Sequence, residues 1–383
     1  LIQRPKIWPL LLILMILWGI WAAVFRYRLR NWVVRWIRGR NFEKSKAKFS
    51  LEQLSQPAAL LSGETVLWYN AEFCARILGG ALDTRVDAAV LPLAASGAEW
   101  MITTDGFTVE PLEFPGGDIG SLAVHGTVND LAVSGATPRY LSLNVFIEEG
   151  LEMAVLERIT HSIARSCAEA GVSILAGDTK VVRRGQGGGL YLATTGIGVR
   201  TTQTPLGLDR IQPGDQLVVS GSVGDHGAAV MLARAQFNLS GTLRSDAACV
   251  LPVTRILQQI PGLRFMRDPT RGGLATVAHD IAAATGAGVR LYEEQIPVQA
   301  PVASVCEILG YDPLYLASEG RVVAVLSPDA APAAVDALKA AGFADASTIG
   351  IVEDLNNLVV LQTSLGGERI LPELEDDPLP RIC

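Results

Sequence analysis

Apolar and polar positions along this chain alternate in short blocks separated by glycine- and aspartate-rich turns. Short apolar runs predict strands at 88–91, 100–104, 140–146, 172–176, 190–199, 216–220, 322–326 and 359–362. Longer segments with helical spacing predict helices at 119–133, 151–170, 228–235, 274–284, 300–309 and 331–341. Strands and helices mix in both halves, and 383 residues suffice for two cores. We therefore expect an α/β (α+β) protein of two domains.

The two ends differ from this body. Trp8 to Phe25 is an uncharged run of 18 residues, and arginines and lysines follow it up to Lys48. This pattern is typical of a marginal membrane-spanning helix that leaves the body in the cytoplasm. Because the chain begins with Leu1 and not Met, a miscalled start or an upstream fusion is the alternative. We expect an extension at 1–50, domains at 51–205 and 206–367, and a mobile Pro- and acid-rich tail at 368–383.

Charge and cysteine content indicate which ligands and which cellular compartment suit the protein. The first 50 residues hold 11 Lys and Arg against Glu43 alone, whereas the remainder holds 21 against 38 Asp and Glu. An acidic body argues against nucleic-acid binding and predicts a cation such as Mg²⁺ wherever a polyphosphate is handled. The five cysteines are dispersed without metal-ligand spacing, which predicts free thiols in a reducing, cytoplasmic compartment.

The sequence has neither a Walker A pattern nor a strand-GxGxxG-helix unit. Carboxylates instead follow predicted strands or turns, at Asp87, Asp105, Asp118, Asp130 and Asp178. Carboxylates that converge at strand ends hold hard cations against phosphates. For any one of them alone, a helix cap or a turn residue is the simpler explanation, but five in one predicted domain favour a site.

Five further residues are candidates for the site, and three of them are open to a structural interpretation as well. Lys180 pairs with Asp178 or faces a phosphate. Asp268 and Arg271 precede a predicted helix and suit an anion, although Asp268 is also a plausible N-cap. His226 is one of four histidines and is structural or catalytic. Glu319 enters a glycine turn beside an apolar segment, where burial would raise its pKa and suit it to proton transfer.

The chain ends in Cys383, which follows an acidic and proline-containing stretch. Such a thiol is either an incidental end or the carrier of a covalent group. The adjacent terminal carboxylate should raise the thiol pKa of Cys383. We therefore expect it to depend on a partner for loading.

Taken together, six strings resemble the HypE family of hydrogenase maturation proteins over roughly 81–383. The strings are 114–150, 170–182, 221–230, 267–277, 306–320 and the terminal Pro-Arg-Ile-Cys. The resemblance implies a PurM-like ATP-binding fold of two domains, usually a homodimer with paired N-terminal sheets. It also implies that a HypF-type carbamoyltransferase loads the terminal cysteine, that ATP drives dehydration to a thiocyanate, and that a HypC–HypD complex accepts the cyanide for [NiFe]-hydrogenase iron.

The same resemblance implies residue roles. Mg²⁺ would be held by Asp87, Asp105, Asp130 and Asp178, and Asn129 would join them around the phosphates of ATP. Lys180 and Glu319 would contact the thiocarboxamide on Cys383, with Glu319 as the base. The pocket would be completed by Asp225, His226, Asp268 and Arg271, with His226 a further catalytic candidate.

Three departures from the family pattern keep alternatives open. The family's His-Gly-x-Gly-Gly segment is not recognisable in 51–80, Val86 stands where a second acid is common, and His125 and Ser318 replace the usual Cys and Asn. One alternative is a membrane-anchored, catalytically impaired scaffold for maturation proteins. The other is a different PurM-like enzyme, such as a thiamine-monophosphate kinase or a selenophosphate synthetase, neither of which needs a terminal cysteine.

Overall fold

The computed structural model describes residues 59–62, 65–69, 86–91, 98–201, 206–234 and 241–374. The chain divides into two compact units, 1–82 and 83–383. In the first unit, β1 (Ala59–Ser62) and β2 (Thr65–Tyr69) form an antiparallel hairpin. The uncharged run at 8–25 and the tail end with Cys383 lie outside the described residues. No helix within the described ranges has the length and apolar character needed to cross a membrane.

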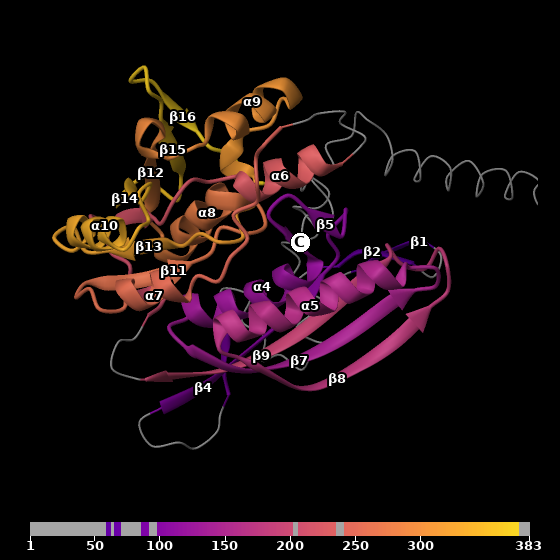
Figure 1. Ribbon diagram of the computed structural model, residues 1–383. Helices are drawn as coiled ribbons and strands as arrows, with labels where there is room; N and C mark the ends of the chain where they lie inside the picture. Colours follow the sequence, from indigo (N-terminus) through magenta and orange to yellow (C-terminus); the bar gives the residue numbers. More distant parts are fainter. Residues whose placement is uncertain are drawn as a thin grey trace, which may run out of the picture. The chain divides into compact units, whose positions relative to one another are not determined.

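The second unit begins with a five-stranded sheet in the order β3-β4-β9-β7-β8. The strands are β3 (Ala89–Leu91), β4 (Ala98–Phe107), β9 (Leu190–Thr201), β7 (Thr137–Glu148) and β8 (Ser173–Val182). Only β7 and β8 are parallel, and helix α5 (Met153–Ala170) connects them. Figure 1 shows α4 (Ile119–Val133) and α5 lying across one face of this sheet. β8 is the edge strand, and nearly all its residues are exposed.

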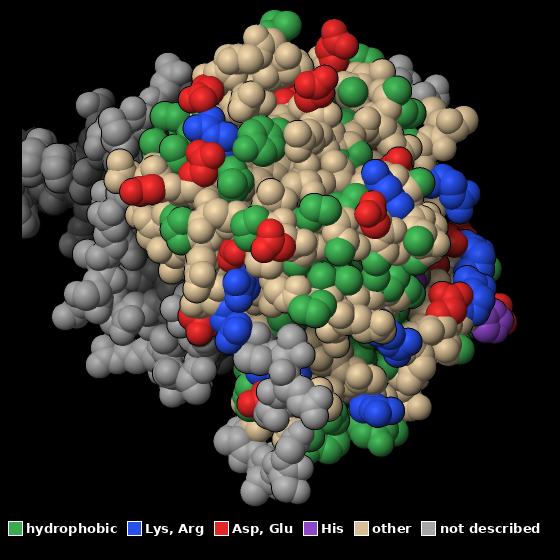
Figure 2. Space-filling view, turned by 90° about the vertical axis from the view of Figure 1, so that its left-hand side faces the viewer, with side chains coloured by type: hydrophobic (Ala, Val, Ile, Leu, Met, Phe, Trp, Pro, Cys, Tyr) green, Lys and Arg blue, Asp and Glu red, His purple; other side chains and the backbone are tan. Residues whose placement is uncertain are grey.

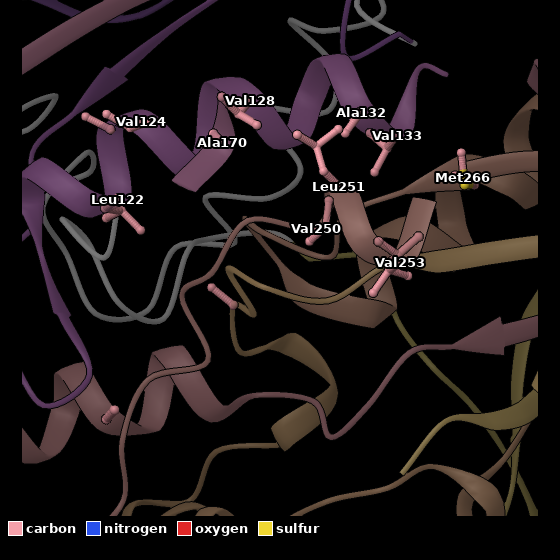
Figure 3. Close-up of a cluster of buried hydrophobic side chains, with 14 of the residues drawn as sticks. Leu122, Val124, Val128, Ala132, Val133, Ala170, Val250, Leu251, Val253 and Met266 are labelled. Atoms are coloured by element: carbon pink, nitrogen blue, oxygen red, sulfur yellow. The ribbon is translucent and has the colours of Figure 1, made fainter. Parts of the chain in front are cut away.

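Helix α4 begins and ends where the sequence predicts. Asp118 caps its first turn by accepting hydrogen bonds from the backbone N–H groups of Gly120 and Ser121, at 2.7 and 2.9 Å. Almost every side chain of α4 is buried, because the helix lies between the five-stranded sheet and the second half of the unit. In Figure 3 its Val128 and Val133 lie toward residues of that second half, among them Leu251.

The second half is built on a seven-stranded sheet in the order β11-β13-β10-β14-β12-β15-β16. The strands are β11 (Leu263–Arg267), β13 (Val323–Leu326), β10 (Gln216–Val219), β14 (Ser347–Glu353), β12 (Gly288–Tyr292), β15 (Val359–Gln362) and β16 (Glu368–Ile370). Its helices are α6 (Asp225–Ala233), α7 (Leu251–Leu257), α8 (Gly273–Thr285), α9 (Ala300–Leu309) and α10 (Ala331–Ala340). A 3-10 turn at Pro313–Tyr315 follows α9.

Edge strand β16 is fixed by charge as well as by backbone pairing. Arg290 on β12 pairs with Glu353 on β14 and with Glu368 on β16, at 2.9 and 2.6 Å. Figure 2 shows one face of the molecule, on which acidic and basic side chains are interspersed. Individual exposed pairs of this kind contribute little stability. Arg290 is itself mostly buried, however, so it holds three strands of this sheet in register.

Two predictions about element bounds are wrong in ways that affect the site. β8 continues to Val182, so Asp178 and Lys180 lie on a strand rather than in a turn after Ala176. An exposed strand has no inward-facing apolar residues to mark its length in the sequence. Residues 368–370 form β16 instead of opening a mobile tail. The sequence prediction also missed β11, β12, β14 and α7.

Candidate active site

Buried carboxylates from distant parts of the chain gather in one region of the second unit. Asp105 comes from β4, Asp130 from α4, Asp268 from the residue after β11, and Asp87 from the segment before β3. Asp130 has a pKa well above its ordinary value, because burial disfavours its charge and Asp105, Asp268 and Asp87 repel it. The structure therefore brings together four of the carboxylates that the sequence singled out.

Two threonines hold the strand and helix members of this acidic cluster. Thr103 donates a hydrogen bond of 2.7 Å to Asp130, and Thr127 donates one of 3.4 Å to Asp105. Burial raises the pKa of Asp105, while hydrogen bonds from Asp130 and Thr127 lower it. Two neighbouring carboxyl groups that hydrogen-bond each other must share a proton, so the pair does not carry two full charges. Sequence reasoning missed both threonines, because nothing in a β-branched core residue signals a role at a site.

Arg267 supplies the positive charge of the cluster. Its guanidinium lies 2.9 Å from Asp87 and 2.8 Å from Asp280 on α8. Burial raises the pKa of Asp87 to about 6, against the opposing attraction of Arg267. Burial, and after it repulsion by Asp87, raises the pKa of Asp268 to about 8. The cluster has more carboxyl groups than cationic partners, so at neutral pH it holds protons that a bound cation can replace.

Glu319 lies in the same buried region with one oxygen of its carboxyl group unsatisfied. The residue is 2% exposed, and its Oε1 has no hydrogen-bond partner among the described residues. Burial, followed by repulsion from Asp268, Asp246 and Asp105, raises its pKa well above the ordinary value. An unpartnered buried carboxyl group is costly and is a recognised signature of functional sites.

The backbone at Glu319 is clamped from two sides. Asp246 accepts hydrogen bonds from the N–H groups of Glu319 and Gly320, at 3.3 and 3.2 Å. Asn129 donates to the carbonyl oxygens of Glu319 and Ala248, at 3.2 and 3.0 Å, and accepts from a backbone N–H in the same loop. Both N–H donors of the Asn129 amide are thus engaged with protein, so its geometry favours positioning Glu319 over donating to a nucleotide.

A second buried network lies behind Asp246. Arg321 contacts Asp225 at 3.2 Å and Asp246 at 3.7 Å, and it donates a bond of 2.9 Å to the carbonyl oxygen of Ser222. His226 is fully buried, hydrogen-bonded to Ser245 at 2.8 Å, with the ring of Phe114 edge-on at 5.2 Å. Asp225 and His226 therefore support the site from behind, in line with the structural interpretation of His226.

Three predicted site residues lie apart from the buried cluster. Asp178 and Lys180 pair with each other at 2.7 Å on edge strand β8, where their side chains are 56% and 63% exposed. On β8, Asp178 lies opposite Asn144 of β7. Asp105 of β4 is aligned, across β9, with the β7 residue next to Asn144. Side chains alternate between faces, so Asp178 and Asp105 point to opposite sides of the sheet. Arg271 is exposed in the loop before α8.

The acidic cluster suits a hard cation by its chemistry. Carboxylate oxygens are the protein ligands that Mg²⁺ prefers, and mutual repulsion among Asp87, Asp105, Asp130 and Asp268 is relieved when a cation binds. Within the described part of the chain, no three His, Cys, Asp or Glu side chains are close enough to hold a metal ion by themselves. This agrees with the usual coordination of Mg²⁺ by one or two carboxylates together with phosphate oxygens of a substrate.

Comparison with known proteins identifies the class. Residues 85–200 match the family described as AIR synthase related protein, N-terminal domain, and residues 212–361 match its C-terminal domain. The fold and its acidic site thus define a two-domain protein of the AIR synthase related class. The carbamoyl dehydratase HypE of Rhizobium leguminosarum bv. viciae is 46% identical over 291 residues, 75% of this chain and 83% of the relative. The chain belongs to the HypE family.

Solved structures agree with this assignment. A HypE structure in complex with ATP is 42% identical, with a TM-score of 0.71 over 80% of this chain and 92% of that one. A HypE–HypF complex gives 40% identity and a TM-score of 0.72, over 79% of this chain and 99% of that chain. A ThiL structure complexed with AMPPCP and TMP, at 19% identity and a TM-score of 0.59, shows the shared fold alone.

Proposed function

We propose that the chain is an ATP-dependent carbamoyl dehydratase of [NiFe]-hydrogenase maturation, acting on an S-carbamoyl group carried by its own Cys383. In the balanced reaction, the thiocarboxamide and ATP give a thiocyanate, ADP and inorganic phosphate. The amide oxygen leaves with the phosphoryl group, and both N–H protons of the amide are lost. An amide oxygen is a poor leaving group, so the reaction needs phosphoryl transfer and a base.

The observation that carries the proposal is Glu319, a buried carboxyl group whose Oε1 has no hydrogen-bond partner among the described residues. Its raised pKa makes the ionised form a stronger base than an ordinary glutamate. Asn129 and Asp246 fix its backbone, so the carboxyl group is held in place before a substrate arrives. Glu319 is therefore our assignment for the group that takes a proton from the thiocarboxamide nitrogen.

ATP and Mg²⁺ are the cofactors that this site supports. The relative solved with ATP has the same fold and 42% identity. One or two carboxylates of the acidic cluster (Asp87, Asp105, Asp130 and Asp268) would hold the cation together with phosphate oxygens of ATP, and a bound Mg²⁺ would neutralise charge on the transferring phosphoryl group. The pKa of Asp268, raised to about 8, means that cation binding there would release protons.

We propose a HypF-type carbamoyltransferase as the loading partner and a HypC–HypD complex as the cyanide acceptor. The solved HypE–HypF complex, which matches 79% of this chain, supports the first partner. A thiol next to a terminal carboxylate is a weak nucleophile at neutral pH, so delivery of an activated carbamoyl group suits Cys383. A membrane tether through residues 8–25 stays a prediction; retention of the full chain in the soluble fraction without detergent would contradict it.

The side of the five-stranded sheet that no described helix covers supports a homodimer. Among the described elements, helices cover only one face of that sheet (Figure 1). The other face carries Trp100, Ile102, Tyr140 and Ile197. On edge strand β8, the apolar side chains of Leu175 and Val181 are 67% and 71% exposed. Apolar side chains on a free sheet face and edge favour pairing with a second copy.

Intact-mass spectrometry tests the proposal. The protein is incubated with the HypF-type partner, carbamoyl phosphate and ATP, and we expect an adduct that then loses the mass of one water. Cys383→Ala should remove the adduct, whereas Glu319→Gln should keep it and slow the loss of water. An adduct that appears unchanged in Cys383→Ala would refute the proposal.

The catalytically impaired scaffold is not favoured by the comparisons, because the relatives are named carbamoyl dehydratases. In the same experiment, a scaffold would take up the carbamoyl group on Cys383 but never lose water from it. Glu319→Gln would then leave the mass profile unchanged.

A further inference from the structure

The last described residues of the chain, 371–374, are anchored to the second half of the fold. Leu371 is fully buried, and its N–H donates a hydrogen bond of 2.8 Å to the carbonyl oxygen of Val359 on β15. Its carbonyl oxygen accepts a hydrogen bond of 3.0 Å from Nε2 of His279 on α8. The hydroxyl of Tyr315 donates a hydrogen bond of 2.6 Å to the carbonyl oxygen of Pro372. These three bonds fix the chain immediately after edge strand β16.

This segment runs along α8 toward the helix N-terminus. It contacts His279 at Leu371, and the side chain of Leu374 lies over Gly272, where an added Cβ would approach Cδ2 of Leu374 to 3.0 Å. Seven helical residues rise about 10 Å, and three extended residues span about 10 Å. The match means that residues 371–374 follow α8 in an extended path from its middle to its first turn.

That first turn adjoins the acidic cluster. Gly272 is four residues from Asp268, a separation of at most about 14 Å. Glu373 repels Asp280, which pairs with Arg267, and Arg267 pairs with Asp87. The nine residues from Glu375 to Cys383 reach at most about 30 Å when extended. The tail therefore starts beside the cluster and is long enough for Cys383 to enter it.

We propose that Tyr315 and His279 are positioning residues for the dehydration: they fix residues 371–374 as the root from which the nine-residue tail delivers Cys383 to the site of its own chain. This inference rests on the proposed function, because it requires Cys383 to carry the substrate. Burial raises the pKa of Tyr315 to about 12, so its hydroxyl remains a hydrogen-bond donor throughout the working pH range. Partly buried Tyr315 and His279 both hold main-chain oxygens, so the root does not depend on the side chains of the tail.

Loss of the root would lengthen the tether and move its origin. With the bonds from Tyr315 and His279 gone, Leu371 would still be held by its buried side chain and its bond to Val359, so the free chain would begin after Leu371 and comprise 12 residues in place of nine. Effective concentration falls roughly as the −3/2 power of tether length, which gives about a 1.5-fold loss. The origin would also retreat by about 10 Å toward the sheet edge, the span of residues 371–374. We expect the combined loss in delivery to be about two- to fivefold.

The test compares delivery in cis with turnover in trans. For cis, Cys383 is loaded by the HypF-type partner, and loss of water from the tail is followed by intact mass in a single turnover with ATP. For trans, Cys383→Ser protein is given a synthetic S-carbamoyl nonapeptide of residues 375–383. The variants are Tyr315→Phe and the double variant Tyr315→Phe with His279→Ala. Tyr311→Phe, a nearby tyrosine change without a described tail contact, is the matched control.

We expect the double variant to slow the cis reaction about two- to fivefold while trans turnover stays unchanged or rises, since a loosened tail competes less with the peptide. Tyr315→Phe should give a smaller loss in cis, and Tyr311→Phe none. Equal losses in cis and trans would show a merely structural role and overturn the inference, as would an unchanged cis rate. If even the unsubstituted protein never loses water from the loaded tail, the proposed function fails and the inference falls with it.

Discussion

The side-chain amide of Asn129 joins α4 to the carbonyl oxygen of Glu319, 190 positions away in the chain, through a hydrogen bond of 3.2 Å. The same amide also bonds two backbone groups of the loop at 248–250. Asn129→Ala would leave two backbone groups of that loop without a partner, whereas the carbonyl oxygen of Glu319 keeps a bond of 3.4 Å from the N–H of Ala248. Each unsatisfied buried group costs about 1–3 kcal/mol, so we expect unfolding free energy to fall by about 2–6 kcal/mol in chemical denaturation. Asn144→Ala, on the open face of β7, is the matched control and should change it by less than about 1 kcal/mol.

Gly320 makes close approach of two backbones possible at Glu319. A Cβ at this position would overlap the carbonyl oxygen of Asp246, a backbone atom that cannot move aside cheaply. We expect Gly320→Ala to lower the unfolding free energy by about 1–3 kcal/mol and to slow dehydration, because the Glu319 carboxyl group is displaced.

Gly106→Ala on β4 is the control for this change, since an added Cβ there meets nothing within 4 Å. Thermal unfolding and the single-turnover rate should both stay near the unsubstituted values. If Gly320→Ala were as stable and as active as Gly106→Ala, the clamp around Glu319 would not be tight.

The acidic cluster makes stability depend on pH in an unusual direction. Asp87, with a pKa of about 6, and Asp268, with a pKa of about 8, both lie above their ordinary value of 3.8 in the folded state. The folded chain therefore binds more protons than the unfolded chain between about pH 4 and 8. Unfolding free energy should fall as pH rises through this window when divalent cations are chelated. Urea titrations at several pH values measure it.

Asp268→Asn supplies the control for that pH dependence. The amide does not ionise, so part of the loss of stability between pH 6 and 8 should disappear. Asp178→Asn should not flatten the curve, because the pKa of Asp178 is lowered by Lys180 and the residue is exposed. A protein that becomes more stable from pH 6 to 8 under chelation would contradict the raised pKa values.

Mg²⁺ with ATP should reverse this trend. The cation competes with protons for Asp105, Asp130 and their neighbours, and ligands that bind only the folded state stabilise it. We expect the rise in unfolding temperature on adding Mg²⁺ and ATP to be larger at pH 8 than at pH 6. Asp130→Asn should reduce the rise, whereas Asp178→Asn should not. Equal responses of both variants would exclude the buried cluster as the cation site.

Features fixed by neighbours in the sequence were predictable. The α4 helix was predicted at 119–133 because its cap, Asp118, and its apolar run are local, and α9 at 300–309 and β15 at 359–362 were found for similar reasons. The HypE family was recognised from strings such as 267–277 and 306–320, and the comparisons confirm it. Asp87, Asp105, Asp130, Asp268 and Glu319 were singled out by residue type and turn context.

Features fixed by distant partners were not predictable. No sequence pattern pointed to a site role for Arg267, Asp246, Arg321 or Thr103. Each of them contacts a carboxyl group or a backbone group that is far away in the chain. Asp178 and Lys180 looked like a phosphate loop, yet register places them on an exposed edge strand. The sequence alone determined the family and which carboxyl groups were candidates for a site. Only the tertiary structure decided which of them meet and which are protonated, because burial and charge repulsion depend on neighbours that the fold supplies.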